Sequence, residues 1–154
     1  MQISTILRQE AVRVIGAASS KKRLFQEIAE VAQSAYKLKP QTTVEALLDR
    51  ESLGPTGVGH GVALPHARLS GIDQVVGVFV SLEKPLDFGA VDRQPVDIVF
   101  ALLAPVDAGV EHLKALALVS RTLREQSFCT KLRANPDPAT LYTILTENPT
   151  VQAA

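Results

Sequence analysis

Two apolar runs near the middle of the chain constrain its fold more than any other feature of the sequence. Val75 to Leu82 and Asp97 to Ala104 are rich in Val, Ile, Phe and Leu, and turn residues bound both of them. Runs of this length and composition are typical of strands buried in a sheet. The segment between them, from Lys84 to Pro95, contains Asp, Gly and Pro and predicts an excursion or a small hairpin.

Helical periodicity precedes these runs. After Ser20, apolar residues recur every three or four positions until the chain nears Lys39, which predicts a long amphipathic helix. Thr42 stands three residues before Glu45, the spacing of a capping box, and the residues that follow predict a short helix that ends near Glu51. Arg50 is expected in the last turn of this short helix.

Two further helices are predicted after the second apolar run. Residues 109–125 carry apolar side chains at helical spacing, and His112 falls in the first turn. Asp137 followed by Pro138 predicts the cap and the first position of a last helix. On the long helix we expect the buried face to carry Leu113, Leu116, Ala117, Ser120 and Leu123.

Helices that alternate with strands predict an α/β fold built in layers. The chain has 154 residues, of which 46% are hydrophobic and 21% charged, and this is the size and composition of one globular domain. No internal repeat or low-complexity tract divides it. We therefore expect a single domain over residues 1–154, with a small, polar tail at 148–154 that frays.

Charge and cysteine content exclude several classes of protein. Sixteen basic and sixteen acidic residues balance, so no overall field holds nucleic acid or an anionic membrane surface. The single cysteine, Cys129, cannot form an internal disulfide, and helical spacing buries it beside Phe128 and Leu132. The amino terminus is not a secretory signal, and the apolar run 98–104 is far shorter than the ~20 residues that cross a bilayer. We expect a cytoplasmic protein without membrane insertion.

The most unusual segment is GVGHGVALPHAR at 57–68, which combines three glycines, a proline, two histidines and an arginine. A neutral histidine keeps a free ring nitrogen, which can accept a phosphoryl group near neutral pH. Pro65 restricts the backbone before His66, and the N–H groups of the upstream glycines can approach phosphate oxygens. This segment therefore offers His66 as a candidate nucleophile.

Other side chains could complete a phosphate site around His66. Arg50 and Arg68 could neutralise a phosphoryl group during transfer, and His112 could add a hydrogen bond from the start of its helix. None of these spacings is specific by itself. The residues alone leave two interpretations open: a phosphoryl acceptor, or a histidine in an exposed turn.

Three other kinds of site receive less support. The glycine-rich segment lacks the Gly-Lys-Ser/Thr ending of a nucleotide-binding P-loop, and no Gly-x-Ser-x-Gly elbow of a serine hydrolase occurs. A zinc site could be built from His60, His66 and His112, but the spacing is not that of an HExxH helix. His60, between two glycines, is better explained as a loop residue.

Taken together, two segments resemble a known family. LLDRESLGPTGVGHGVALPHARL at 47–69 and EHLKALALVSRTL at 111–123 are similar to the enzyme IIA domain of the fructose/mannitol class of the bacterial phosphoenolpyruvate-dependent phosphotransferase system. The resemblance covers nearly the whole chain. Within that class the chain most resembles the nitrogen-regulatory enzyme IIA proteins.

The resemblance implies a mixed sheet flanked by helices and a role for each candidate residue. The motif at 61–66 implies that His66 accepts a phosphoryl group on Nε2 from a histidine phosphocarrier protein. Arg50 and His112 match the family's arginine and second histidine, which orient and neutralise that group. The implied protein is a cytoplasmic phosphotransferase component that needs no cofactor or bound metal and controls target proteins through its phosphorylation state.

Two departures from the family pattern bear on partner choice. Ala67-Arg68 follows the active histidine where many relatives have Gly-Lys, and His60 stands where relatives often carry Asn or Asp.

Two alternatives to the regulatory carrier stay open. One is a sugar-specific enzyme IIA that passes its phosphoryl group to a separate IIB domain, and the other is a regulator that acts through its binding surface alone.

Overall fold

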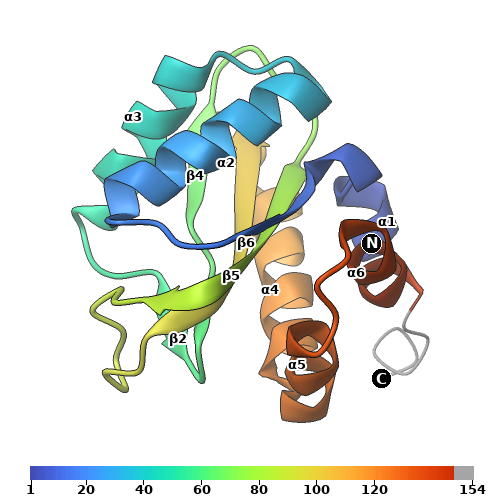
Figure 1. Ribbon diagram of the computed structural model, residues 1–154. Helices are drawn as coiled ribbons and strands as arrows, with labels where there is room; N and C mark the ends of the chain where they lie inside the picture. The colour runs from blue at the N-terminus through green and yellow to red at the C-terminus, as the bar shows by residue number, and fades with distance from the viewer. Residues whose placement is uncertain (148–154) are drawn as a thin grey trace.

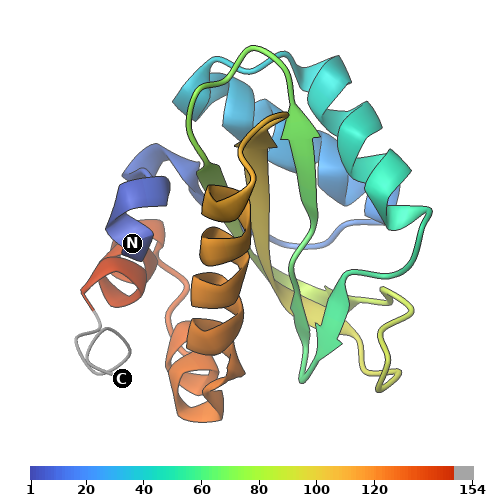
Figure 2. The same cartoon turned by 180° about the vertical axis from the view of Figure 1, so that it is seen from behind.

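The computed structural model describes residues 1–147 and places a mixed β-sheet between layers of helices. Two helices, α2 and α3, lie on one face of the sheet, and α4 lies on the other (Figures 1 and 2). This arrangement confirms the predicted α/β class, with a mixed sheet flanked by helices. The predicted frayed tail at 148–154 lies outside the described residues.

Six strands form the sheet in the order β1-β5-β6-β3-β2, and β4 also pairs with β6. β5 and β6 are antiparallel neighbours, as a hairpin requires, whereas β1 runs parallel to β5, and β3 and β4 both run parallel to β6. The two predicted runs are therefore adjacent in the sheet. The strands are β1 Val12–Ile15, β2 Gly57–Gly59, β3 Val62–Ala63, β4 His66–Leu69, β5 Val76–Leu86 and β6 Val96–Pro105.

The helices predicted from sequence are present, and the cap predicted at Asp137 forms. The Ser20 side chain accepts a hydrogen bond from the Arg23 N–H, and the Asp137 side chain accepts one from the Thr140 N–H. Two short elements at the amino terminus, which the sequence did not predict, precede β1. The helices are α1 Ile3–Ile6, the 3₁₀ helix η1 Gln9–Ala11, α2 Lys21–Tyr36, α3 Pro40–Glu51, α4 Val110–Arg124, α5 Gln126–Arg133 and α6 Pro138–Thr146.

The predicted capping box of α3 is wrong. The helix begins at Pro40, two residues before Thr42, and the Glu45 carboxylate accepts a hydrogen bond from the Gln41 side chain. Proline suits the first position of a helix because it needs no N–H partner there and its φ is already helical. The end of α3 at Glu51 agrees with the prediction.

The predicted buried face of α4 is also wrong for most of its length. Leu113 is 65% exposed, whereas His112 on the other side of the helix is buried. The helix packs on β6 through a stripe that includes His112 and Thr122. Because these two residues are polar, the spacing of apolar residues does not predict the stripe. The buried residues are His112, Ala115, Leu118, Val119, Thr122 and Leu123.

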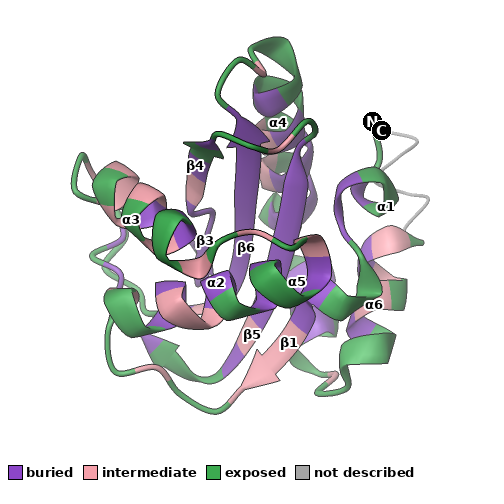
Figure 3. Cartoon of the chain, turned by 90° about the horizontal axis from the view of Figure 1, so that it is seen from above, coloured by how far each residue is buried: buried purple, intermediate pink, exposed green. Residues whose placement is uncertain are grey.

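The core is centred on β6, which is buried along most of its length (Figure 3). Phe100 on β6 meets Phe79 on β5 edge to face, with ring centroids 6.3 Å apart. Cys129 is buried in α5 with Phe128 and Leu132, as the helical spacing predicts. Among residues 1–147, no helix is both long and apolar enough to cross a bilayer.

Tyr36 at the end of α2 joins the amino-terminal segment to the sheet. Its hydroxyl donates a hydrogen bond to the Gly77 carbonyl at 2.7 Å and accepts one from the Arg8 N–H at 3.0 Å. Burial raises the pKa of this hydroxyl to about 12, because the phenolate form would lose its hydration.

Candidate functional site

His66 is the first residue of β4 and lies beside the centre of the sheet. It is in register with Leu102 of β6, and the Leu102 N–H donates a hydrogen bond to the Pro65 carbonyl at 2.9 Å. The backbone on both sides of the imidazole is therefore held by a buried strand. His66 itself is half-buried, so part of the residue stays accessible.

A backbone carbonyl determines which nitrogen of His66 is free. Nδ1 lies 2.9 Å from the Leu64 carbonyl oxygen. A carbonyl oxygen only accepts hydrogen bonds, so Nδ1 must carry the proton. In the neutral ring Nε2 then holds the lone pair, and this is the nitrogen that can act as a nucleophile.

His112 lies next to His66 and is more deeply buried. The two ring centroids are 5.6 Å apart, with planes inclined at 68°, and His112 is only 6% exposed. Burial lowers the pKa of His112, and the charges of His66 and Arg68 lower it further. His112 is therefore neutral near neutral pH.

The Nε2 atom of His112 is buried and, within residues 1–147, has no hydrogen-bond partner. Buried polar side-chain atoms are nearly always paired, because leaving one unpaired costs about 1–3 kcal/mol. An orphaned nitrogen beside a free nucleophile indicates a place for a polar group of a bound molecule, such as a phosphoryl oxygen.

The two arginines predicted for the site are held by different elements. Arg50 lies in the last turn of α3, which packs against β4, and its guanidinium donates to the Gly54 carbonyl at 3.0 Å. Arg68, two residues after His66 on the same strand, is exposed and donates to the Val106 carbonyl at 3.0 Å. Arg68 thus ties β4 to the loop that precedes the helix of His112.

His60 does not join these residues. It lies in the turn between β2 and β3 with a φ of 56°, and its N–H donates to Asp92 while its carbonyl accepts from Arg133. Its imidazole Nδ1 is 3.3 Å from the side-chain nitrogen of Gln126 on α5. His60 is thus a turn residue, as the sequence indicated.

The zinc alternative consequently loses its ligand set. Gly61, next to His60, bonds to the beginning of β6 at Ile98, whereas His66 is in register with Leu102 further along that strand. In the part of the chain that the structure describes, no three His, Cys, Asp or Glu side chains gather as a metal site would require.

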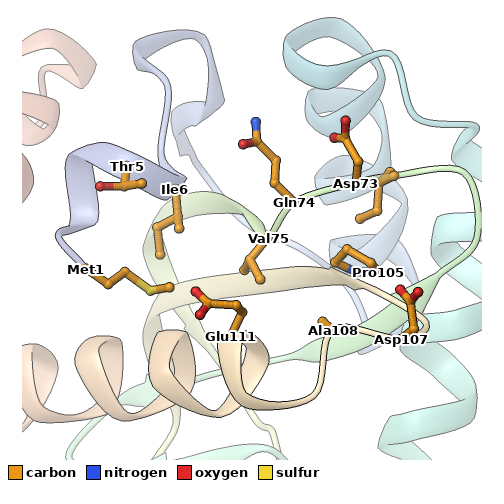
Figure 4. A pocket seen from close by; sticks show the side chains of 11 residues that line it. Met1, Thr5, Ile6, Asp73, Gln74, Val75, Pro105, Asp107, Ala108 and Glu111 are labelled. Atoms are coloured by element: carbon orange, nitrogen blue, oxygen red, sulfur yellow. The ribbon is translucent and has the colours of Figure 1, made fainter.

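A cavity of about 570 Å³ opens near this end of the sheet, between α1 and the beginning of α4 (Figure 4). Asp73, Asp107 and Glu111 line it together with apolar side chains such as Ile6 and Val75. Neither His66 nor His112 belongs to its lining. The cavity is therefore separate from the pair of histidines.

The sequence suggested His66 and His112, which the structure places side by side, but it did not indicate the group that bonds to Nδ1 of His66. That group is the main-chain carbonyl of Leu64, and a main-chain atom leaves no signature in the residue type. It also missed that Arg68 is tied to Val106, because this contact depends on how the loop before α4 folds.

Comparison of the whole chain with known proteins identifies its relatives. The family model described as "Phosphoenolpyruvate-dependent sugar phosphotransferase system, EIIA 2" matches residues 5–148. A nitrogen regulatory protein of Bradyrhizobium diazoefficiens is 42% identical, over 99% of this chain and 100% of that protein. One of Escherichia coli (strain K12) is 43% identical, over 96% of this chain and 91% of the other.

A solved structure agrees with these sequence matches. The crystal structure of nitrogen regulatory protein IIA-Ntr from Neisseria meningitidis superposes with a TM-score of 0.86 at 35% identity. The match covers 94% of this chain and 99% of that one, so it extends over nearly the whole of both chains.

Proposed function

The chain belongs to the EIIA 2 family of the phosphoenolpyruvate-dependent sugar phosphotransferase system, and from this we propose that it is a regulatory phosphoryl carrier that accepts its phosphoryl group on His66. The donor is a histidine phosphocarrier protein. The observation that carries the proposal is the hydrogen bond from Nδ1 of His66 to Leu64, because it leaves Nε2 free at the half-buried edge of the sheet.

The transfer exchanges one phosphorus–nitrogen bond for another. Nε2 of His66 attacks the phosphorus of the donor's phosphohistidine in line with the bond that breaks, and the donor's imidazole leaves with that electron pair. Positive charge develops on the His66 ring as its lone pair is shared. The Leu64 carbonyl stabilises this charge through the Nδ1 proton, which stays in place.

The neighbouring groups act on the phosphoryl oxygens. His112 offers its orphaned Nε2, which donates a hydrogen bond in the tautomer that carries the proton there. Arg50 and Arg68 supply positive charge from α3 and β4. Groups that are held in position before the donor arrives would need little reorganisation during transfer.

The output of the protein is its change in surface charge. A phosphoryl group on His66 adds negative charge and several strong hydrogen-bond acceptors to an exposed edge, and such a change makes or breaks contacts with target proteins. The names of the relatives favour nitrogen regulation over sugar transport. A cytoplasmic location and control of target proteins belong to the same proposal.

The test is phosphorylation by purified donor proteins. Wild type, His66→Ala and His60→Asn are incubated with phosphoenolpyruvate, enzyme I and the phosphocarrier protein, and intact mass is measured. His60→Asn is the matched control because asparagine tolerates the left-handed backbone of that turn. We expect an acid-labile phosphoryl mass on wild type and His60→Asn but none on His66→Ala.

Two outcomes would redirect the proposal. Unphosphorylated wild type, with a charged donor present, would leave a regulator that acts by binding alone. Fast transfer from the phosphorylated protein to a separate IIB domain would favour the sugar-specific alternative.

A further inference from the structure

A carboxylate that does not touch His66 is joined to it through a series of hydrogen bonds. Glu51, the last residue of α3, has a side chain that is only 7% exposed. Its carboxylate accepts three bonds: from the Lys21 ammonium at 2.8 Å, from the Thr56 N–H at 2.9 Å and from the Thr56 hydroxyl at 2.6 Å. Glu51 therefore holds Thr56 by both its backbone and its side chain.

Thr56 in turn holds Leu64, the residue whose carbonyl is bonded to His66. Thr56 is 5% exposed, and its carbonyl accepts the Leu64 N–H at 3.0 Å. The carbonyl of the same Leu64 accepts the Nδ1 proton of His66 at 2.9 Å. The series runs from Glu51 through Thr56 and Leu64 to the imidazole.

Leu64 lies between two anchored points of the backbone. On its carboxyl side the Pro65 carbonyl is bonded to Leu102 of β6, a strand in the core. On its amino side Ala63 of β3 pairs with Val99 of β6, and the Leu64 N–H itself is bonded to the Thr56 carbonyl, which belongs to the loop between α3 and β2. A loop carbonyl keeps a fixed direction only when its own residue is held, and Glu51 holds it.

The direction of the Leu64 carbonyl matters because histidine has two neutral tautomers. Only the Nδ1–H tautomer leaves Nε2 with a lone pair, and the hydrogen bond made by the other nitrogen determines which tautomer is present. If Thr56 moves, the Leu64 carbonyl turns, and the preference for Nδ1–H weakens.

We propose that Glu51 is a positioning residue for His66: through Thr56 it orients the Leu64 carbonyl and so maintains the Nδ1–H tautomer with Nε2 as the nucleophile. The consequence for phosphoryl transfer rests on the proposed function. The effect on the tautomer does not, because it is a property of the unphosphorylated protein.

The test is the tautomer ratio of His66, read from the ¹⁵N shifts of its two ring nitrogens by NMR in unphosphorylated protein. Glu51→Gln has the same shape, but it replaces one carboxylate oxygen with an NH₂ group that cannot accept a hydrogen bond. We expect the ratio of Nδ1–H to Nε2–H to fall by about three- to tenfold, the effect of losing one ordinary hydrogen bond. The rate of phosphorylation falls by no more than the same factor.

A control separates positioning from general stability. Tyr36→Phe removes hydrogen bonds to Gly77 and Arg8 at the carboxyl end of α2, whereas Lys21 lies at the amino end, so the change lowers stability and removes no bond of the series. We expect the His66 ratio of Tyr36→Phe to equal that of wild type. A ratio in folded Glu51→Gln that equals wild type, or an equal fall in Tyr36→Phe, would overturn the proposal.

A milder pair of variants serves if Glu51→Gln does not fold. Thr56→Val removes the hydroxyl bond to Glu51 but keeps the shape and the N–H, and Thr56→Ser restores a hydroxyl. The proposal requires a shifted ratio in Thr56→Val and a ratio near wild type in Thr56→Ser, and equal ratios in both would contradict it. If wild type proves unable to accept a phosphoryl group, the proposed function fails while these NMR ratios still decide the role of Glu51.

Discussion

The imidazole of His66 meets the imidazole of His112 edge to face, with 5.6 Å between the ring centroids. The two rings differ in what surrounds them: Nδ1 of His66 is bonded to a carbonyl, whereas Nε2 of His112 is buried and, within the described residues, has no partner. Nδ1 of His66 thus has a hydrogen-bond partner, whereas the neighbouring His112 keeps an unused hydrogen-bonding group.

Replacing His112 with leucine should raise stability while it slows the reaction. His112→Leu removes a buried unpaired nitrogen, so we expect the free energy of unfolding to rise by about 1 kcal/mol in urea denaturation. Phosphorylation of His66 should slow by about 100-fold, because a group that stabilises the transferring phosphoryl oxygens is lost. A less stable His112→Leu protein would mean that Nε2 has a partner in solution.

The lowered pKa of His112 predicts a loss of stability in mild acid. The unfolded chain binds this proton near pH ~6.5, and the folded chain binds it only at lower pH, so protons favour unfolding as pH falls through that window. Above about pH 7 the contribution is fully retained. Melting temperatures at about pH 7.5 and about pH 5.5 should therefore differ more for wild type than for His112→Leu. Equal differences in the two proteins would argue against a buried, neutral His112.

Tyr36 should titrate late in the folded protein. The chain has two tyrosines, so Tyr142→Phe leaves Tyr36 as the only phenol in a near-ultraviolet absorbance titration. We expect ionisation at about pH 12 in the folded state. The folded pKa is raised above the unfolded value of about 10, so this group's contribution to stability is present below about pH 10 and is lost as the pH rises towards the folded value. Ionisation near pH 10 while the protein is still folded would contradict the buried hydroxyl.

Two glycines with similar backbone angles should respond differently to alanine. Gly61 has a φ of 80° and Gly71 a φ of 85°, so both substitutions are strained by about 1 kcal/mol. A Cβ at Gly61 would also lie 2.6 Å from Nη2 of Arg133 and 3.0 Å from Oδ1 of Asp97, whereas no described atom outside its neighbours lies within 4 Å at Gly71. Urea denaturation should show that Gly61→Ala loses about 1–2 kcal/mol more than Gly71→Ala, because the Arg133–Asp97 pair must move. Similar losses would show that Arg133 moves aside freely.

Elements with strong local signals could be predicted from the sequence. Asp137 caps its helix as expected, α2 begins directly after Ser20, and β5 and β6 occupy the two apolar runs. The short strand β1 was missed because its four residues pair only with β5, a partner distant in sequence. The capping box at Thr42 failed because Pro40 is a stronger start for a helix.

The site was predictable as a list of residues but not as an arrangement. The motif around His66 predicts a nucleophile at this position, yet the orientation of its ring depends on a carbonyl of Leu64, which any residue could supply. His112 was expected in a first turn. That it turns towards the sheet, with Leu113 left exposed, depends on which of two competing stripes of α4 packs on β6.

The position of β4 in the sheet also bears on how copies of this protein behave at high concentration. A strand at the margin of a sheet can pair with a strand of another molecule, and such pairing begins aggregation. Here β3 and β4 both pair with β6, and Pro65, which has no N–H to donate, lies between them. In addition, α3 packs against β4. Pro65 thus also protects the sheet from self-association along the strand that carries His66.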